Sequence, residues 1–221
     1  RVDPAICPNG YVCSQIALAS PNLRCPSGYF CPNGTRTSDP FRNDTTLRPY
    51  PCNPGTFCLS GVGWDVVVPG DYRYAQNCSA GFFCELGSSS PRGSGMCPVG
   101  FYCPEGTAVP IPTKKGQVSQ LPGTINPAFC APGFYTPTIE SSQCYPCPSG
   151  TVCSNDGASI ADVCPPGTYR STIANDNILC RGCPQGTWSK NWELGEMGEC
   201  VSRPEGSFES SMKTDSLGPS C

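Results

Sequence analysis

The chain repeats one short cysteine motif along almost its whole length. The motif is Cys-x-x-Gly followed by two aromatic or β-branched residues, as in Cys25-Pro-Ser-Gly-Tyr-Phe-Cys31. Six copies close with a second cysteine six residues after the first, and they begin at Cys7, Cys25, Cys52, Cys78, Cys97 and Cys147. Three more copies, beginning at Cys130, Cys164 and Cys183, keep the opening but move the closing cysteine. A motif repeated so often predicts a tandem array.

Composition indicates what holds such an array together. Among 221 residues there are 19 cysteines, 25 glycines and 26 prolines, which is the composition of a disulfide scaffold from an oxidising, extracellular setting. The aromatic and β-branched pair after each glycine favours a short strand, while turn residues interrupt every window long enough for a helix. We therefore expect a small disulfide-rich fold: short β-hairpin and turn repeats in an elongated array, with little helix and no single large core.

Proline placement predicts the type of turn in each copy. In Cys-Pro-x-Gly, proline at the second place and glycine at the fourth favour a type I turn. In the copies at Cys52 and Cys130 the proline stands one place later. The turn frame is expected to move with it there, giving glycine the positive φ of a type II turn. The copies are then not all superimposable.

The cysteines allow two regular pairing schemes. Joining each cysteine to the next closes every repeat, and we prefer this scheme; offsetting every pair by one, so that Cys13 joins Cys25, leaves Cys7 unpaired instead. In the preferred scheme Cys221 is left over, so the chain is expected to continue past it in a longer parent protein. The preferred pairs are Cys7 with Cys13, Cys25 with Cys31, Cys52 with Cys58, Cys78 with Cys84, Cys97 with Cys103, Cys130 with Cys144, Cys147 with Cys153, Cys164 with Cys180 and Cys183 with Cys200.

Spacing between copies suggests three regions. Residues 1–103 hold five closed repeats with irregular spacers. Residues 104–129 contain no cysteine and several prolines, which predicts a semi-rigid linker. Residues 130–221 hold more regular repeats. The first region carries three N-linked glycan acceptors, Asn33, Asn43 and Asn77. Its spacer at 64–68 is the best isolated strand candidate, and we expect that strand to be packed rather than to form a binding edge.

Several kinds of chemistry are excluded or disfavoured. The chain has no histidine, which removes Ser-His-Asp and Cys-His catalytic pairs and histidine-containing zinc sites, so no enzyme is expected. The Cys-x-x-Cys pairs at 144–147 and 180–183 resemble zinc ligands, but in an oxidising compartment disulfides are the better interpretation. The clusters at 155–157 and 175–177 offer calcium oxygen ligands without an EF-hand pattern, so no metal cofactor is expected.

Charge and hydropathy exclude two classes of partner. The net charge is −3 and the one basic doublet is Lys114-Lys115, which gives no footprint for nucleic acid. No stretch reaches the roughly 18 to 20 apolar residues of a membrane span, so no membrane insertion within this sequence is expected.

The last third of the chain resembles a known repeat family. Cys130-Ala-Pro-Gly-Phe-Tyr-Thr through Cys144-Tyr-Pro-Cys147, and Cys164-Pro-Pro-Gly-Thr-Tyr through Cys180-Arg-Gly-Cys183, are similar to the ephrin-receptor-like cysteine-rich repeat over residues 130–208. Combined with the closed repeats before it, the sequence resembles cysteine-rich surface and mastigoneme-type proteins of protists. That resemblance implies extracellular modules strung into rods or stalks, and it implies no catalytic residue.

Two functions follow as expectations. The first is a structural or adhesive extracellular module of a surface filament, flagellar hair or stalk, whose partners are neighbouring copies or another chain of the assembly. The second is a segment of a receptor ectodomain that binds a protein or glycan through the loops between repeats. Self-association distinguishes the first from the second.

Overall fold

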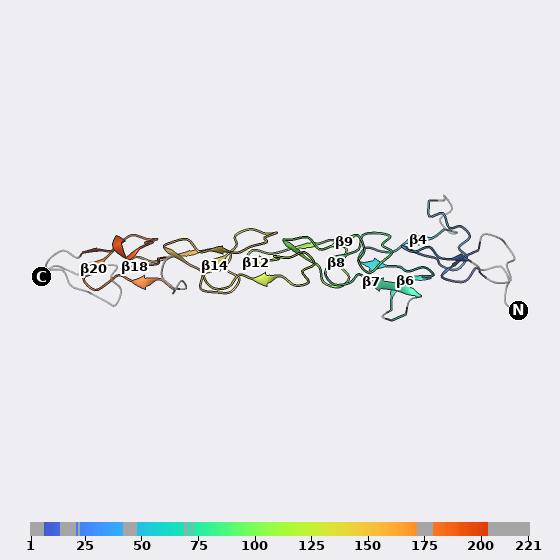
Figure 1. Cartoon of the computed structure of the whole chain (residues 1–221), viewed down its shortest axis with the longest axis horizontal. Coiled ribbons are helices and arrows are strands. Elements are labelled where there is room, and N and C mark those ends of the chain that lie inside the picture. Colours follow the sequence, from blue (N-terminus) through green and yellow to red (C-terminus); the bar gives the residue numbers. More distant parts are fainter. Residues whose placement is uncertain are drawn as a thin grey trace. The chain divides into compact units, whose positions relative to one another are not determined.

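The computed structural model describes residues 7–13, 21, 23–41, 48–68, 70–71, 73–171 and 179–202. The chain forms two compact units, Arg1–Pro112 with Ser119–Pro127, and Thr113–Val118 with Ala128–Cys221. Within each unit, short hairpins follow one another in chain order (Figure 1).

Nearly every strand is two residues long and pairs with a sequence neighbour. In the first unit the strands are β1 (Tyr11–Val12), β2 (Leu23–Arg24), β3 (Tyr29–Phe30), β4 (Tyr50–Pro51), β5 (Thr56–Phe57), β6 (Trp64–Val67), β7 (Tyr74–Asn77), β8 (Phe82–Phe83), β9 (Gly95–Met96), β10 (Phe101–Tyr102) and β11 (Ile111–Pro112). In the second unit they are β12 (Gln117–Val118), β13 (Ala128–Phe129), β14 (Phe134–Tyr135), β15 (Tyr145–Pro146), β16 (Thr151–Val152), β17 (Asp162–Val163), β18 (Thr168–Tyr169), β19 (Arg181–Gly182), β20 (Thr187–Trp188) and β21 (Val201–Ser202). In the described part of the chain, the 3₁₀ turn η1 (Met197–Glu199) is the one helical element.

Each hairpin is built from two successive repeats. Counting the opening cysteine as position 1, the first strand is positions 5 and 6. The second strand is the two residues before the next opening cysteine, except that β11 precedes Thr113 and β21 follows Cys200. In β1 and β2, for example, Tyr11 lies opposite Arg24 and Val12 opposite Leu23. The predicted fold class of short disulfide-closed hairpin repeats, with little helix and no large core, is confirmed.

The spacer after the Cys52 repeat adds the one three-stranded sheet in the described residues. Its order is β5-β7-β6, with β7 antiparallel to β5 and parallel to β6. The predicted strand at 64–68 is therefore present as β6. The expectation that it is packed is wrong, because β6 is an edge strand whose Trp64 and Val66 are 44% and 59% exposed.

The first turn has the same frame in every described copy. The residue at position 5 donates its N–H to the carbonyl of position 2, as Tyr11 does to Pro8 and Thr56 to Asn53, and the glycine at position 4 has positive φ. Glycine is thus the third residue of the turn, the place it takes in a type II turn. The predicted type II turn with positive φ at glycine is confirmed in the copies at Cys52 and Cys130, where Gly55 and Gly133 have φ of 85° and 88°. The predicted type I frame for the Cys-Pro-x-Gly copies is wrong, because those copies share this same frame.

The reason is that the glycine N–H is used by the next repeat. Gly28 donates to the carbonyl of Cys58 at 2.9 Å, and its own carbonyl accepts from the N–H of Cys52 at 3.0 Å. A type I turn closed on the opening cysteine would need that same N–H. The glycine of one repeat therefore holds both ends of the next closed Cys-x5-Cys loop.

Two further backbone bonds complete each junction between repeats. After position 7 the chain makes a second turn, which ends in a residue of positive φ such as Gly61. The N–H of Gly61 reaches the carbonyl of Cys25 at 2.9 Å, and the N–H of Cys31 reaches the carbonyl of Val62 at 3.0 Å. All four bonds recur between the repeats from Cys7 to Cys97 in the first unit and between the Cys130 and Cys147 repeats in the second.

Repeats also contact the next repeat but one. A Cβ built on Gly28 would meet the carbonyl oxygen of Gly87 at well under 3.0 Å, and one on Gly55 would meet that of Gly106 equally closely. Gly28 and Gly55 belong to first turns, whereas Gly87 and Gly106 end second turns two repeats later. Glycine at position 4 therefore has positive φ in every described copy, and at Gly28 and Gly55 the close approach excludes a side chain as well.

Apolar packing is distributed in small clusters centred on disulfides. The residue at position 6 packs on the disulfide of the following repeat: Val12 on Cys25 and Cys31, and Phe30 on Cys52 and Cys58. The same arrangement recurs for Phe57 in the first unit and Tyr169 in the second. Aromatic rings thus pack on the neighbouring disulfide at Phe30, Phe57 and Tyr169.

The cysteine-free segment 104–129 differs from the expected linker. It contains β11, β12 and β13, and the interval 113–119 has the repeat pattern with Thr113 and Ser119 in place of the two cysteines. Gly116 has φ of 80°, donates to the carbonyl of Thr136 and accepts from the N–H of Cys130. This is a tenth copy of the repeat, held by backbone bonds, and the boundary between units falls within it.

Gly55→Ala tests the close approach between repeats. Both Gly55→Ala and the control Gly34→Ala place a β-carbon at φ near 85°, which costs about 1 to 2 kcal/mol. No described atom lies within 4 Å of a Cβ on Gly34, whereas Gly55 faces a carbonyl, so we expect a further loss of about 1 to 3 kcal/mol. Hydrogen exchange of the Cys78 amide, which donates to Gly55, measures the local effect. Equal losses for both variants would contradict the close approach.

Candidate functional site

The eighteen cysteines among the described residues form nine disulfides, each between sequence neighbours. They join Cys7 to Cys13, Cys25 to Cys31, Cys52 to Cys58, Cys78 to Cys84, Cys97 to Cys103, Cys130 to Cys144, Cys147 to Cys153, Cys164 to Cys180 and Cys183 to Cys200. This is the local scheme and not the offset one. A closed seven-residue loop stabilises by about 2.4 kcal/mol in the chain-entropy model. Cys221 lies outside the described residues.

Position 7 of the repeat is buried in nearly every copy, whichever residue occupies it. Where the closing cysteine has moved, the position holds Thr136, Arg170 or Ser189, with exposed fractions of 0%, 3% and 4%. Ser119 holds it in the cysteine-free copy and is 1% exposed. Position 7 tolerates a polar residue because its backbone is hydrogen-bonded to the next repeat. A polar side chain buried there needs a hydrogen-bond partner of its own.

Hydroxyl groups supply such partners around Thr113 and Thr136. The Thr136 hydroxyl donates to Ser141 Oγ at 2.9 Å, and the Ser141 backbone N–H donates to Thr113 Oγ1 at 2.9 Å. The Glu140 N–H donates to the Thr113 carbonyl at 3.2 Å. Hydroxyl groups therefore link the tenth copy to the Cys130 repeat in the second unit.

Arg170 reaches back to the turn of the preceding repeat. Its Nη1 donates to the carbonyl oxygens of Cys147, Pro148 and Thr151 at 3.1, 2.8 and 2.6 Å. Burial lowers the pKa of the guanidinium from its usual value. The side chain thus links two repeats noncovalently at the position where a closed copy has its second cysteine.

The predicted glycan acceptors lie in different surroundings. Asn33 is exposed in the second turn of the Cys25 repeat. Asn77 ends β7, and its Nδ2 donates to Glu105 Oε1 at 3.1 Å beside a cavity of about 300 Å³. Asn43 lies outside the described residues. Glycosylation of these residues stays a prediction.

A larger cavity of about 670 Å³ lies in the first unit, around the exposed end of β6. Trp64 contributes an aromatic ring that is 44% exposed, and Tyr11 contributes a second, half-buried one. Arg24, the cross-strand partner of Tyr11, lines the same cavity, as do Asn9 and Asn33. Its volume is within the range of small-molecule sites, and its lining mixes rings with hydrogen-bonding groups.

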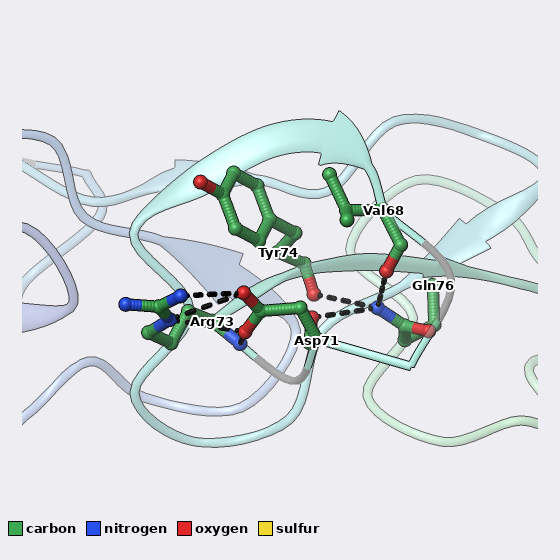
Figure 2. Close-up of polar contacts among 5 residues, drawn as sticks. All are labelled: Val68, Asp71, Arg73, Tyr74 and Gln76. Carbon is green, nitrogen blue, oxygen red and sulfur yellow. Dashed lines mark hydrogen bonds and ion pairs between the residues drawn. The ribbon is translucent and has the colours of Figure 1, made fainter.

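A polar loop after β6 forms another wall of this cavity. Figure 2 shows the Gln76 amide within hydrogen-bond distance of the carbonyl oxygens of Val68, Asp71 and Tyr74, at 3.1, 2.9 and 3.3 Å. Arg73 pairs with Asp71 at 2.7 Å, and that hydrogen bond lowers the pKa of the Asp71 carboxyl. Gln76 closes the loop, and the ion pair keeps both charges together at the cavity wall.

The cavity lining combines aromatic ring faces with hydrogen-bonding groups, which suits a polar ligand that has an apolar face. In the described residues no group of three or more His, Cys, Asp or Glu side chains could hold a metal. The candidate calcium cluster at 155–157 lies on a second turn that ends in Gly157, and 175–177 lie outside the described residues. Sequence reasoning missed this cavity because its lining comes from three repeats; the isolated Trp64 in a strand-like run was the one signal.

Comparison with protein-family models gives no match, and comparison with curated proteins gives none either. The similarity of residues 130–208 to ephrin-receptor-like repeats therefore stays a prediction. Among the described residues, no helix has the length and apolar character needed to cross a membrane. Nine disulfides are typical of proteins from oxidising, secretory or extracellular compartments.

Arg170→Met tests the noncovalent link between repeats. Methionine fills part of the volume but leaves the three carbonyl oxygens without this donor, so we expect a loss of roughly 1.5 to 3 kcal/mol, measured by denaturant unfolding of the second unit. Lys190→Met, which removes an exposed charge, is the matched control and should change stability by less than about 0.5 kcal/mol. A loss no larger than the control's would show that Arg170 does not hold the turn.

Proposed function

We propose that the chain is an extracellular structural or adhesive module that carries load in a surface filament, flagellar hair or stalk. The observation that supports this most is the junction of four backbone hydrogen bonds between successive repeats, each closed by its own local disulfide. We also propose that the array of repeats is elongated. Its partners are neighbouring copies or another chain of the same assembly.

Local closure has a direct mechanical consequence. A covalent loop of seven residues cannot lengthen under tension, so extension must come from breaking junctions and straightening the spacers. Each junction can break without exposing a shared core, because apolar packing is confined to small clusters. The module then yields in small increments and keeps its repeats intact.

Single-molecule pulling tests this behaviour. We expect the oxidised chain to unfold in several small steps, with the longer spacers releasing roughly 40 to 90 Å each at full extension. After reduction the same chain should lengthen further, because about 80 residues are enclosed by the nine loops. One cooperative event that releases the whole contour would contradict the load-bearing proposal.

A receptor segment is the second candidate, favoured by the cavity at Trp64. The two functions differ in assembly: a filament component self-associates, whereas a receptor segment stays monomeric and binds a foreign protein or glycan. We expect the secreted chain to form higher oligomers with rising concentration in size-exclusion chromatography with light scattering. A strictly monomeric chain at all concentrations would favour the receptor.

A further inference from the structure

The rim of the cavity at Trp64 includes Asn33, a residue that can be modified covalently. Asn33 lines it and is the first residue of Asn33-Gly34-Thr35, an N-linked glycan acceptor. The backbone fixes this position: Gly34 donates to the carbonyl of Cys7 at 2.7 Å, and the N–H of Cys13 donates to the carbonyl of Thr35 at 3.0 Å. The acceptor is therefore held beside the first turn of the Cys7 repeat.

Trp64 is held against that same turn. A Cβ built on Gly63 would meet Asn9 Cβ at 2.7 Å and the Gly10 nitrogen at 2.8 Å, so the chain just before Trp64 lies directly on the Cys7 turn. Gly63 also donates to the carbonyl of Arg73 at 2.9 Å. Asn33 and Trp64 thus border one cavity from two segments that are both bonded to or packed on one turn.

The lining suits a saccharide. Exposed tryptophan and tyrosine rings offer apolar faces with polar edges, which sugar rings match with their C–H faces and hydroxyls. Asn9 lines the cavity, and its Oδ1 is buried and has no hydrogen-bond partner in the part of the chain described. The side chains of Asn9, Arg24 and Ser60 at the cavity can hydrogen-bond to the hydroxyl and acetamido groups of an N-acetylglucosamine residue.

A tethered saccharide fits this open site better than a free one. A free ligand loses translational and rotational freedom on binding, and two aromatic faces give little to offset that loss. A sugar attached to Asn33 is already confined beside the rings, at an effective concentration of roughly millimolar or more. Weak stacking is then enough to order it.

We propose that the N-linked glycan of Asn33 folds back into this cavity, with its first N-acetylglucosamine stacked on Trp64. The inference rests on the secretory route in the proposed function. The glycan covers the exposed edge strand β6 at Trp64. It also shields the one exposed tryptophan described in the first unit.

The test uses the full chain secreted from eukaryotic cells, with glycans trimmed enzymatically to one N-acetylglucosamine. Glycopeptide mass spectrometry measures occupancy, and ¹H NMR follows the N-acetyl methyl resonances, of which the Asn33 signal is assigned by its loss in Asn33→Gln. We expect this signal to be shifted upfield by the indole ring and to return to the free-sugar position in Trp64→Ala. Trp192→Ala, which removes another exposed tryptophan, and the glycan on Asn77 are the controls and should show no such change.

Thermal unfolding gives an independent measure. Trp64→Ala should lower Tm by about 2 to 4 °C in the glycosylated chain and much less in the Asn33→Gln background. Trp64→Phe, which keeps a ring, should retain part of the upfield shift of the methyl signal.

An unoccupied Asn33, an unshifted methyl signal, or equal losses of Tm in both backgrounds would overturn the inference. Binding of free chitotriose to Asn33→Gln with no shift in the tethered sugar would overturn it as well. An occupied Asn33 with an unshifted signal leaves the load-bearing function standing, because that function does not depend on the cavity.

Discussion

The structure depends on the hydrogen bonds made by the backbone N–H and C=O of the glycine at position 4 of each repeat. The N–H and C=O of this glycine point to the next repeat and bind its two ends, as Gly28 does with Cys58 and Cys52. Positive φ disfavours a side chain at this position, and a carbonyl of a later repeat leaves no room for one at Gly28 and Gly55. Disulfides close the individual loops, but the backbone at glycine connects one loop to another. The small apolar clusters form where these two constraints bring a ring onto a disulfide.

In the tenth copy, the connection between repeats is present without the disulfide that closes a loop. With Thr113 and Ser119 in the cysteine positions, the copy keeps its glycine, its turn and its bonds to the Cys130 repeat. Hydroxyl groups take over the polar contacts around Thr113. In the Cys164 repeat the buried guanidinium of Arg170 binds the preceding turn instead. The closed seven-residue disulfide loop can therefore be absent from a copy, whereas the glycine is present in every copy.

Sequence reasoning predicted the parts that depend on local chemistry. Short strands, low helix content and distributed aromatics follow from the residue pairs after each glycine, and the structure has them. The turn frame of the Cys-Pro-x-Gly copies could not be predicted this way, because it depends on a carbonyl from the next repeat competing for the glycine N–H. Thr113 and Ser119 were missed because the search required cysteine, although the Thr-x-x-Gly spacing was visible. The Trp64 cavity joins three repeats and has no signature in a single one.

Because the junctions between repeats use main-chain atoms, they make few demands on neighbouring side chains. The spacer before β7 holds an additional strand, and the second turn ends in Gly157 in one copy and in Glu193 in another, yet the same bonds form. Duplication or deletion of a gene segment encoding one repeat would thus leave both new neighbours compatible without compensating substitutions. Such a lineage can change the number of its modules, and with it the length of its product, faster than it changes the chemistry of any one of them.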